Sequence, residues 1–281
     1  MDQQEKNRLS LIAYKIRLNA ITAVYNAGSG HPGGSLSIAD ILSVLYFKEM
    51  NIDPKNPNME NRDRFVLSKG HCAPGLYGAL AERGYIPKED LVTLRKTSSY
   101  LEGHPDKNKI AGVDMSSGSL GQGISVANGM ALAGKIDNKD YRVYTILGDG
   151  EIEEGQVWEA AMFAAHYKLD NLTAFVDYNS LQIDGPITEV MSPEPIADKF
   201  DAFGWNVINI DAHDIEQIVS ALETAKTVKG KPTVIVAKSV KGKGVSFMEN
   251  NVSWHGAAPN TEQFEQAEKE LKAKIKELEE N

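Results

Sequence analysis

An aspartate and an asparagine each follow an apolar run of the sequence, and their types suggest a metal site. Asp149 comes after the run 141–147 and Gly148, and Asn179 comes shortly after the run 172–177. If these runs are neighbouring parallel strands, their carboxyl ends meet at one edge, where open α/β sheets bind ligands. One carboxylate, one amide oxygen and phosphate oxygens are a typical ligand set for Mg²⁺. The sequence therefore predicts a Mg²⁺–phosphate site; alternatively, Asp149 caps a helix and Asn179 makes a turn.

Four of the six histidines lie in loops where glycine or proline fixes the backbone. They are His31 in "GSGHPGG", His71 in "SKGHCAPG", His104 in "LEGHPD" and His255 in "SWHGA". Zinc is one alternative, but zinc sites usually contain closely spaced histidine pairs, which these four do not form. We expect the four rings to converge and to hydrogen-bond a hydroxylated, phosphorylated substrate. The other two, His166 and His213, are interpreted as structural or surface histidines.

Two further patterns suggest phosphate binding. Gly28, Gly30 and Gly33 have the G-x-G-x-x-G spacing of dinucleotide-binding proteins, but a predicted helix precedes them where that motif needs a strand. Lys241 and Lys243, in "VKGKG", are either a phosphate clamp or a basic loop that neutralises nearby acids. The sequence argues against the first pattern and leaves the second open.

The elements that would position these groups alternate between strands and helices. Apolar runs predict strands at 64–68, 141–147, 172–177 and 232–237, with helices at 156–168 and 214–226. A long helix is expected within 7–28, and a second from Ser37, which would cap it while Asp40 closes a capping box. Since the longer strand runs do not alternate strictly, both faces of the sheet should be covered. The order predicts an α/β fold, a three-layer parallel sheet with helices on both faces.

We expect two parts in the chain, a domain at 1–260 and an amphipathic helix at 261–281. One side of that helix carries Phe264, Ala267, Leu271, Ile275 and Leu278. This stripe is expected to dock on the domain, with a partner-binding coiled coil as the alternative.

Composition excludes several classes of protein. The chain has 281 residues, 42% hydrophobic and 25% charged, which is typical of soluble globular proteins. A net charge of −9 argues against binding nucleic acid or an anionic membrane surface. The single cysteine, Cys72, rules out an intramolecular disulfide and fits a reducing compartment. With a polar N-terminus and no membrane-spanning run, the protein is interpreted as cytoplasmic.

The aspartate–asparagine element also resembles a known motif. "GDG" at 148–150 and Asn179, which follows Asp149 by 179 − 149 = 30 residues, resemble the thiamine diphosphate-binding motif. Tyr178 stands where many members of that family have a first asparagine. Six blocks in order resemble transketolases, most closely the amino-terminal subunit of split transketolases: "SGHPGG", "NRDRFVLSKGHCAPGLY", "EGHPD", "SSGSLGQGISVANGMA", "GDGEIEEGQVWEAA" and "KGKGVSFMENNVSWHGA".

The resemblance implies how the cofactor and its metal are held. Mg²⁺, or Ca²⁺ or Mn²⁺ in its place, would be bound by the side chains of Asp149 and Asn179 and by the carbonyl of Leu181. The residues implied for the cofactor are Gly150, His71 and His255 at the diphosphate, Gly118, Ser119 and Leu120 along its length, and Ile183 against its rings. Glu154 and Glu159 resemble acidic residues of the dimer interface that communicate with the cofactor.

The resemblance also implies catalytic roles for the four loop histidines. His31 and His255 would contact the sugar near the bond being cleaved. His104 would hold the hydroxyls of the two-carbon unit, and His71 would bridge the cofactor and the donor sugar.

Finally, the resemblance implies half of an enzyme. In transketolases the glutamate that activates the cofactor and the pocket for its pyrimidine lie in a downstream domain, which we do not find in this sequence. The partner that we therefore expect is a C-terminal transketolase subunit, in a two-plus-two heterotetramer that transfers a glycolaldehyde unit from a ketose phosphate to an aldose phosphate in the pentose phosphate pathway. The alternatives are a transketolase for a variant sugar, a deoxyxylulose-phosphate synthase-like protein, a 2-oxo acid dehydrogenase subunit, or a non-catalytic assembly partner.

Overall fold

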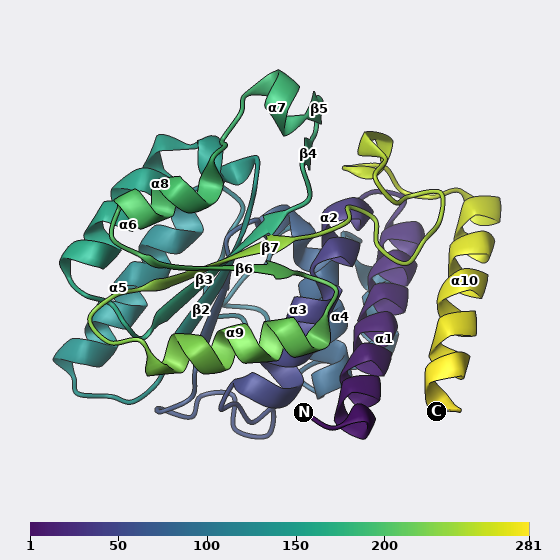
Figure 1. Ribbon diagram of the computed structural model, residues 1–281. Coiled ribbons are helices and arrows are strands. Elements are labelled where there is room, and N and C mark those ends of the chain that lie inside the picture. Colours follow the sequence, from purple (N-terminus) through teal and green to yellow (C-terminus); the bar gives the residue numbers. More distant parts are fainter. Residues whose placement is uncertain (281) are drawn as a thin grey trace.

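A parallel sheet lies at the centre of the computed structural model, which describes residues 1–280 (Figure 1). Its strands are arranged in the order β1 (Arg64–Leu67), β2 (Val143–Gly148), β3 (Leu172–Tyr178), β7 (Thr233–Lys238) and β6 (Asn206–Asp211), with every neighbouring pair parallel. The four predicted strand runs coincide with β1, β2, β3 and β7 to within about two residues, the usual uncertainty of strand ends. Strand β6 was not predicted, because it lies at the edge of the sheet and most of its side chains are partly exposed.

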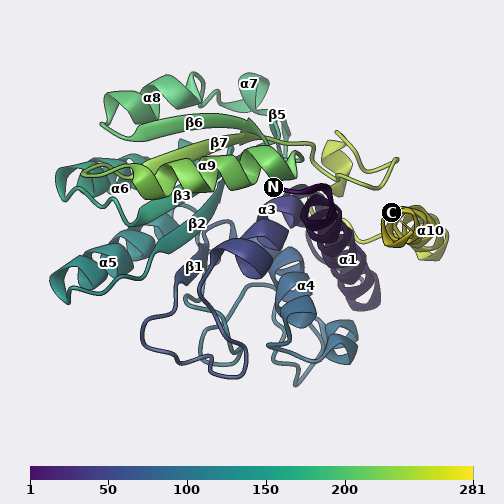
Figure 2. The ribbon, with the colours of Figure 1, turned by 60° about the horizontal axis from the view of Figure 1, so that its bottom comes forward.

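Helices cover both faces of this sheet, so the predicted three-layer α/β fold is confirmed (Figures 1 and 2). Successive residues point to opposite faces: Val234 and Val236 of β7 pack on one side, and Ile235 and Ala237 on the other. The first side is covered by α5 (Gln122–Ile136), α6 (Gly155–His166) and α8 (Ile196–Ala202). The second is covered by α1 (Gln3–Ala27), α3 (Ala39–Val44), α4 (Ala73–Arg83) and α9 (Ile215–Thr227).

The remaining elements lie around the carboxyl edge of the sheet and beside α1. They are α2 (Pro32–Ser37), the hairpin of β4 (Leu181–Gln182) and β5 (Gly185–Pro186), α7 (Ile187–Val190), α10 (Thr261–Glu279), and short turns of helix at Leu45–Glu49, Gly70–Cys72, Lys88–Thr93, Glu151–Glu153 and Val252–Trp254. Helix α10 packs on α1 through its predicted stripe, of which Ala267 and Leu271 are fully buried. None of the helices in residues 1–280 is both long and apolar enough to cross a lipid bilayer.

The predicted cap of the second helix is wrong. Ser37 is the last residue of α2, and α3 begins at Ala39 without a side-chain cap. The hydroxyl of Ser37 instead donates to the carboxylate of Asp177, 2.7 Å away, and Asp40 forms a buried ion pair with Arg17. Both side chains are buried, so partners that are distant in the sequence replace the local capping box.

Helix α5 packs closely against the end of β1, and one glycine permits this. A Cβ atom on Gly123 would lie only 2.5 Å from the Cα of Ser68, whereas a Cβ on Gly129 of the same helix would meet nothing within 4 Å. Replacing Gly123 with Ala should therefore lower the free energy of unfolding by about 1–3 kcal/mol, the usual range for overpacking. Replacing Gly129 with Ala is the matched control and should raise it by up to about 1 kcal/mol. Urea denaturation of both variants measures the difference, and equal stabilities would contradict the close packing.

Candidate active site

The carboxyl ends of β2 and β3 lie side by side and open onto a cavity of about 320 Å³. Gly148, the last residue of β2, pairs with Asp177 of β3, and the amide of Asp149 donates to the carbonyl of Asp177 at 3.3 Å. Asp149 and Asn179 are both buried, and both line the cavity with Leu181. The side chains that the sequence placed at the ends of neighbouring strands therefore share one cavity.

Oxygen atoms of this edge are held in a compact set of hydrogen bonds. Asp149 accepts from the amides of Gly150, at 3.0 Å, and Ser180, while the side-chain oxygen of Asn179 accepts from the amide of Leu181 at 3.2 Å. The carbonyl of Leu181 accepts from Lys241 Nζ at 2.8 Å. Burial, and then the neighbouring carboxylate of Asp177, raise the pKa of Asp149 to about 7. A cation at this carboxylate would relieve that repulsion.

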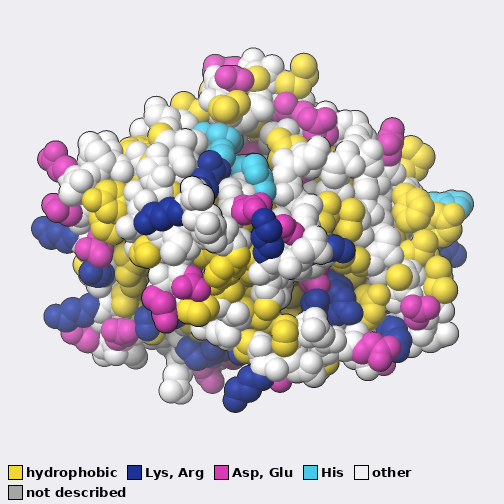
Figure 3. Space-filling view, turned by 180° about the vertical axis from the view of Figure 1, so that it is seen from behind, with side chains coloured by type: hydrophobic (Ala, Val, Ile, Leu, Met, Phe, Trp, Pro, Cys, Tyr) yellow, Lys and Arg dark blue, Asp and Glu magenta, His cyan; other side chains and the backbone are white. Residues whose placement is uncertain are grey.

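Three of the four loop histidines form a cluster that lines the same cavity. The ring centroids of His31, His71 and His255 are 5.1 to 5.5 Å apart. Figure 3 shows histidines gathered beside Lys or Arg side chains in the upper middle of one face. Burial is the main cause that lowers the pKa of His31 and His71 to about 4 and that of His255 to about 3. The three rings are therefore neutral near pH 7, and each can donate one hydrogen bond and accept another.

His104 does not belong to this cluster. It lines a neighbouring hollow of about 640 Å³ with Arg95 and Ser29. The two hollows adjoin, since Gly118 lines the first and a Cβ on Gly118 would lie 3.2 Å from the His104 ring. Burial, followed by the charge of Arg95, lowers the pKa of His104. Three of the four histidines therefore converge on one cavity, and the fourth lines the adjoining hollow.

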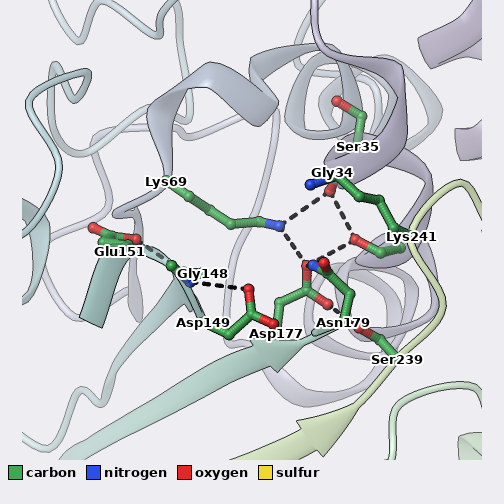
Figure 4. A network of polar contacts seen from close by, with 12 residues as sticks. Gly34, Ser35, Lys69, Gly148, Asp149, Glu151, Asp177, Asn179, Ser239 and Lys241 are labelled. Atoms are coloured by element: carbon green, nitrogen blue, oxygen red, sulfur yellow. Dashed lines mark hydrogen bonds and ion pairs between the residues drawn. The ribbon is translucent and has the colours of Figure 1, made fainter. Parts of the chain in front are cut away.

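A buried ion pair that was not predicted from the sequence joins Lys69, which lines the cavity, to Asp177 (Figure 4). Lys69 Nζ is 2.5 Å from Asp177 Oδ2 and donates to the carbonyl of Gly34 at 3.2 Å. The other donors to the Asp177 carboxylate are Ser37, Ser239 and Asn179. Burial alone would raise the pKa of Asp177, but Lys69 and the hydroxyls of Ser239 and Ser37 together hold that pKa below its usual range. The pair fixes the ends of β1 and β3 relative to each other.

Glu151 was likewise not assigned and joins three segments around the cavity. One of its carboxylate oxygens accepts from the hydroxyl of Ser68 and the amide of Gly121, and the other accepts from the amide of Gly148. Burial raises the pKa of Glu151. The side chain thereby ties the loop that precedes α5 to the end of β2.

Comparison with known proteins decides the family. Residues 9–278 match the family described as transketolase, thiamine diphosphate binding domain. The chain belongs to the transketolase family. The crystal structure of transketolase from Campylobacter jejuni superposes on this chain with a TM-score of 0.90 at 35% identity. The superposition covers 99% of this chain and 46% of the Campylobacter jejuni chain.

Two similar proteins are subunits of split transketolases. The 6-deoxy-6-sulfo-D-fructose transketolase subunit SqwG of Clostridium sp. (strain MSTE9) is 50% identical over 256 residues, or 91% of this chain and 93% of that protein. A subunit of the apulose-4-phosphate transketolase of Phocaeicola vulgatus is 43% identical over 271 residues, or 96% of each. Human transketolase is 44% identical over 98% of this chain but only 44% of its own length. The chain thus corresponds to the amino-terminal subunit of a split transketolase, a thiamine diphosphate-dependent transferase.

The remaining residues implied by the transketolase resemblance are divided between the cavity and the surface. Gly118, Leu120, Gly150 and Ile183 line the cavity, whereas Ser119 does not. Glu154, directly before α6, and Glu159, within α6, are both exposed. Of the two lysines left open, Lys241 is buried in the cavity, and Lys243 pairs with Glu249 outside it. The glycines that mimic a dinucleotide motif follow helix α1 and lack the preceding strand that the motif requires.

The cavity fits the cofactor of transketolases. It contains the buried carboxylate of Asp149 and the buried ammonium group of Lys241, which suit a metal and a diphosphate respectively. Two buried polar atoms of its lining, His31 Nδ1 and Gln182 Nε2, have no hydrogen-bond partner within residues 1–280. Buried polar atoms normally have partners, so these atoms fit a bound polar ligand.

Proposed function

We propose that this chain holds the metal and the diphosphate end of the cofactor, and that a partner subunit completes the active site. The assembled enzyme transfers a two-carbon glycolaldehyde unit from a ketose phosphate to an aldose phosphate, as in the pentose phosphate pathway. The observation that carries the proposal is the single cavity that collects Asp149, Asn179 and three neutral histidines at the edge of β2 and β3. Sugar phosphate substrates and the single cysteine suit the cytoplasm, where we place the enzyme.

Asp149, Asn179 and the Leu181 carbonyl would hold Mg²⁺, for which Ca²⁺ or Mn²⁺ could substitute, with diphosphate oxygens as further ligands. In the structure, Lys241 Nζ donates to the Leu181 carbonyl. A metal bound to that carbonyl would displace the ammonium group, which would then contact the diphosphate. Thiamine diphosphate supplies the carbon nucleophile and the electron sink for breaking and forming the C–C bond. The amide of Gly150 would donate to the diphosphate, the loop 118–120 would line the cofactor, and Ile183 would cover its rings.

The neutral histidines would act on the sugar. His31 and His255 would accept and return the proton of the hydroxyl next to the bond that breaks, which an unprotonated imidazole can do. His71, between Lys69 and the other rings, would contact both the cofactor and the donor sugar. His104 would bind the hydroxyls of the two-carbon unit from the neighbouring hollow.

The partner subunit would supply the activating glutamate and the pyrimidine pocket. The exposed surface of α5 and α6 is the face that we assign to subunit contacts in a two-plus-two assembly. It presents Val126, Met162 and Phe163, which are 37%, 59% and 37% exposed, and Phe163 lines a shallow hollow with Glu159. Apolar side chains grouped on a surface are typical of protein interfaces.

A second candidate is a transketolase for a modified sugar. The names of two similar subunits favour it, since one is named for a sulfonated fructose and the other for apulose 4-phosphate. Both candidates use the same cofactor site and differ in the sugar that reaches the histidines.

The test is to titrate thiamine diphosphate with Mg²⁺ into this chain, alone and with its partner subunit, and then to assay two-carbon transfer. We expect transfer only when both subunits are present, with a ketose phosphate as donor. Transfer by this chain alone would contradict the shared active site. Cofactor binding with transfer only from a sulfonated ketose would support the second candidate, and absence of cofactor binding would contradict both.

A further inference from the structure

Two buried side chains and a partly buried histidine connect α1 to the backbone beside the cavity. Arg17 and Asp40 form an ion pair in which Nη1 and Nη2 contact the two carboxylate oxygens, and the side chains are 1% and 7% exposed. His213, in the turn between β6 and α9, places its Nδ1 2.8 Å from Asp40 Oδ2. The other ring nitrogen, Nε2, lies 2.9 Å from the amide nitrogen of Val240.

These partners define which nitrogen of His213 carries the proton. The amide of Val240 can only donate, so Nε2 must accept and carry no hydrogen. Nδ1 then carries the proton and donates to Asp40. Burial would raise the pKa of Asp40, but the charge of Arg17 and the contacts from His213 lower it to about 2, so the carboxylate is ionised and accepts. A carboxylate that orients an imidazole in this way also fixes its tautomer.

The amide held by His213 belongs to the residue before Lys241. The backbone on either side is fixed by Ser239, whose amide donates to Tyr178, and by Gly242, whose amide donates to Gly33. From this backbone the Lys241 side chain reaches the cavity, where Nζ contacts the Leu181 carbonyl at 2.8 Å and His255 Nδ1 at 3.0 Å. The position of the ammonium therefore depends on the backbone at Val240.

We propose that His213 is a positioning residue that holds Val240, so that the Lys241 ammonium meets the diphosphate of the cofactor, with Asp40 and Arg17 fixing its tautomer. This role rests on the proposed function, because it requires a diphosphate in the cavity. It makes His213 part of cofactor binding, although its ring does not line the cavity.

Two substitutions separate the two contacts of the ring. In H213N the amide nitrogen can replace Nδ1 and keep the bond to Asp40, but the acceptor for Val240 is lost. In H213Q the longer side chain carries an oxygen at the place of Nε2, so the Val240 bond is kept and the Asp40 bond is lost. Glu223, which is exposed on α9, the helix that follows His213, offers the control E223Q.

The measurement is the Kd of thiamine diphosphate with Mg²⁺ by calorimetry on the assembled enzyme, with hydrogen exchange of the peptide that spans 239–242. We expect H213N to weaken binding by about 10- to 100-fold, the usual cost of losing a group that orients a ligand-binding residue. Exchange at 239–242 should become faster in H213N, while H213Q and E223Q keep affinities near that of the wild type. In a K241M background H213N should cause no further loss, because its effect passes through Lys241.

Other outcomes would overturn the inference. If the wild type binds the cofactor and H213N binds it equally well, His213 has only a structural role, whatever its effect on stability. An additive loss in H213N/K241M would also contradict it. If H213N does not fold, H213Q alone tests the proposal. A tenfold loss of cofactor affinity in H213Q, which keeps the Val240 contact, would contradict it. A wild type that binds no cofactor would instead refute the proposed function.

Discussion

Replacing Asp149 with Ala should abolish two-carbon transfer and weaken binding of Mg²⁺ and thiamine diphosphate by more than about 100-fold. Even groups that only orient a metal ligand change affinity by about 10- to 100-fold, so the loss of a ligand should exceed that range. Asp149 supplies the only side-chain carboxylate among the three proposed ligands, and the Asn179 amide and Leu181 carbonyl carry no formal charge to replace it. Calorimetric titration and the transfer assay measure both effects.

The control for this variant is Asp201→Ala, which removes an exposed carboxylate of α8 far from β2 in the sequence. It should retain both cofactor affinity and transfer. Circular dichroism must show that Asp149→Ala is folded, since the amides of Gly150 and Ser180 lose their acceptor. Full activity in folded Asp149→Ala would contradict the assignment of the metal site.

Replacing Lys69 with Met should lower the free energy of unfolding by about 3–5 kcal/mol, because it leaves the buried carboxylate of Asp177 without its cation. The pair is almost completely buried, with exposures of 2% and 0%, so water cannot stabilise the remaining charge. The double variant K69M/D177N removes both charges, and an asparagine at 177 can still accept from Ser37 and Asn179 through its oxygen and donate to the Ser239 hydroxyl through its amide group. We therefore expect the double variant to be more stable than K69M, which urea denaturation measures.

An exposed lysine provides the comparison for Lys69. Lys139 forms an ion pair with Glu60 at 2.5 Å on the surface, where the pairing is weak and screened by salt. Lys139→Met should leave the denaturation midpoint nearly unchanged. If K69M/D177N lost as much stability as the two single variants together, the charges of Lys69 and Asp177 would not be coupled, and the account of the buried pair would be wrong.

Much of the fold could be predicted from the sequence because its signals are local. The runs that form β2, β3 and β7 are mostly apolar, and nearly all of their residues are buried on both faces of the sheet. Helix α5 lies in a stretch that the sequence analysis left without an element, since Gly123, Gly129 and Gly134 lower its helix propensity. The packing of Gly123 on Ser68 and of Gly134 on Tyr141 stabilises a helix that propensity alone does not indicate.

The candidate site divides in the same way. Asp149 and Asn179 could be found because each lies at or just after the end of an apolar run. A carboxylate and an amide oxygen are also a typical ligand set for Mg²⁺. Lys69 and Glu151 could not, since their partners are distant: Lys69 pairs with a residue 108 positions away, and Ser68 contacts Glu151 across 83 positions. A buried charge gains its role from the group that neutralises it, and the sequence does not indicate that group. His213 was interpreted as structural or surface for the same reason.

The contact between Lys241 and the Leu181 carbonyl has a consequence for the order of loading. A bare divalent cation that enters the cavity meets an ammonium that already contacts one of its proposed ligands, and the two positive charges repel each other. An anionic chelate of the same cation carries its own counter-charge and attracts that ammonium away. The apoenzyme should therefore capture metal and cofactor as one preassembled complex, and discriminate against free cations in solution.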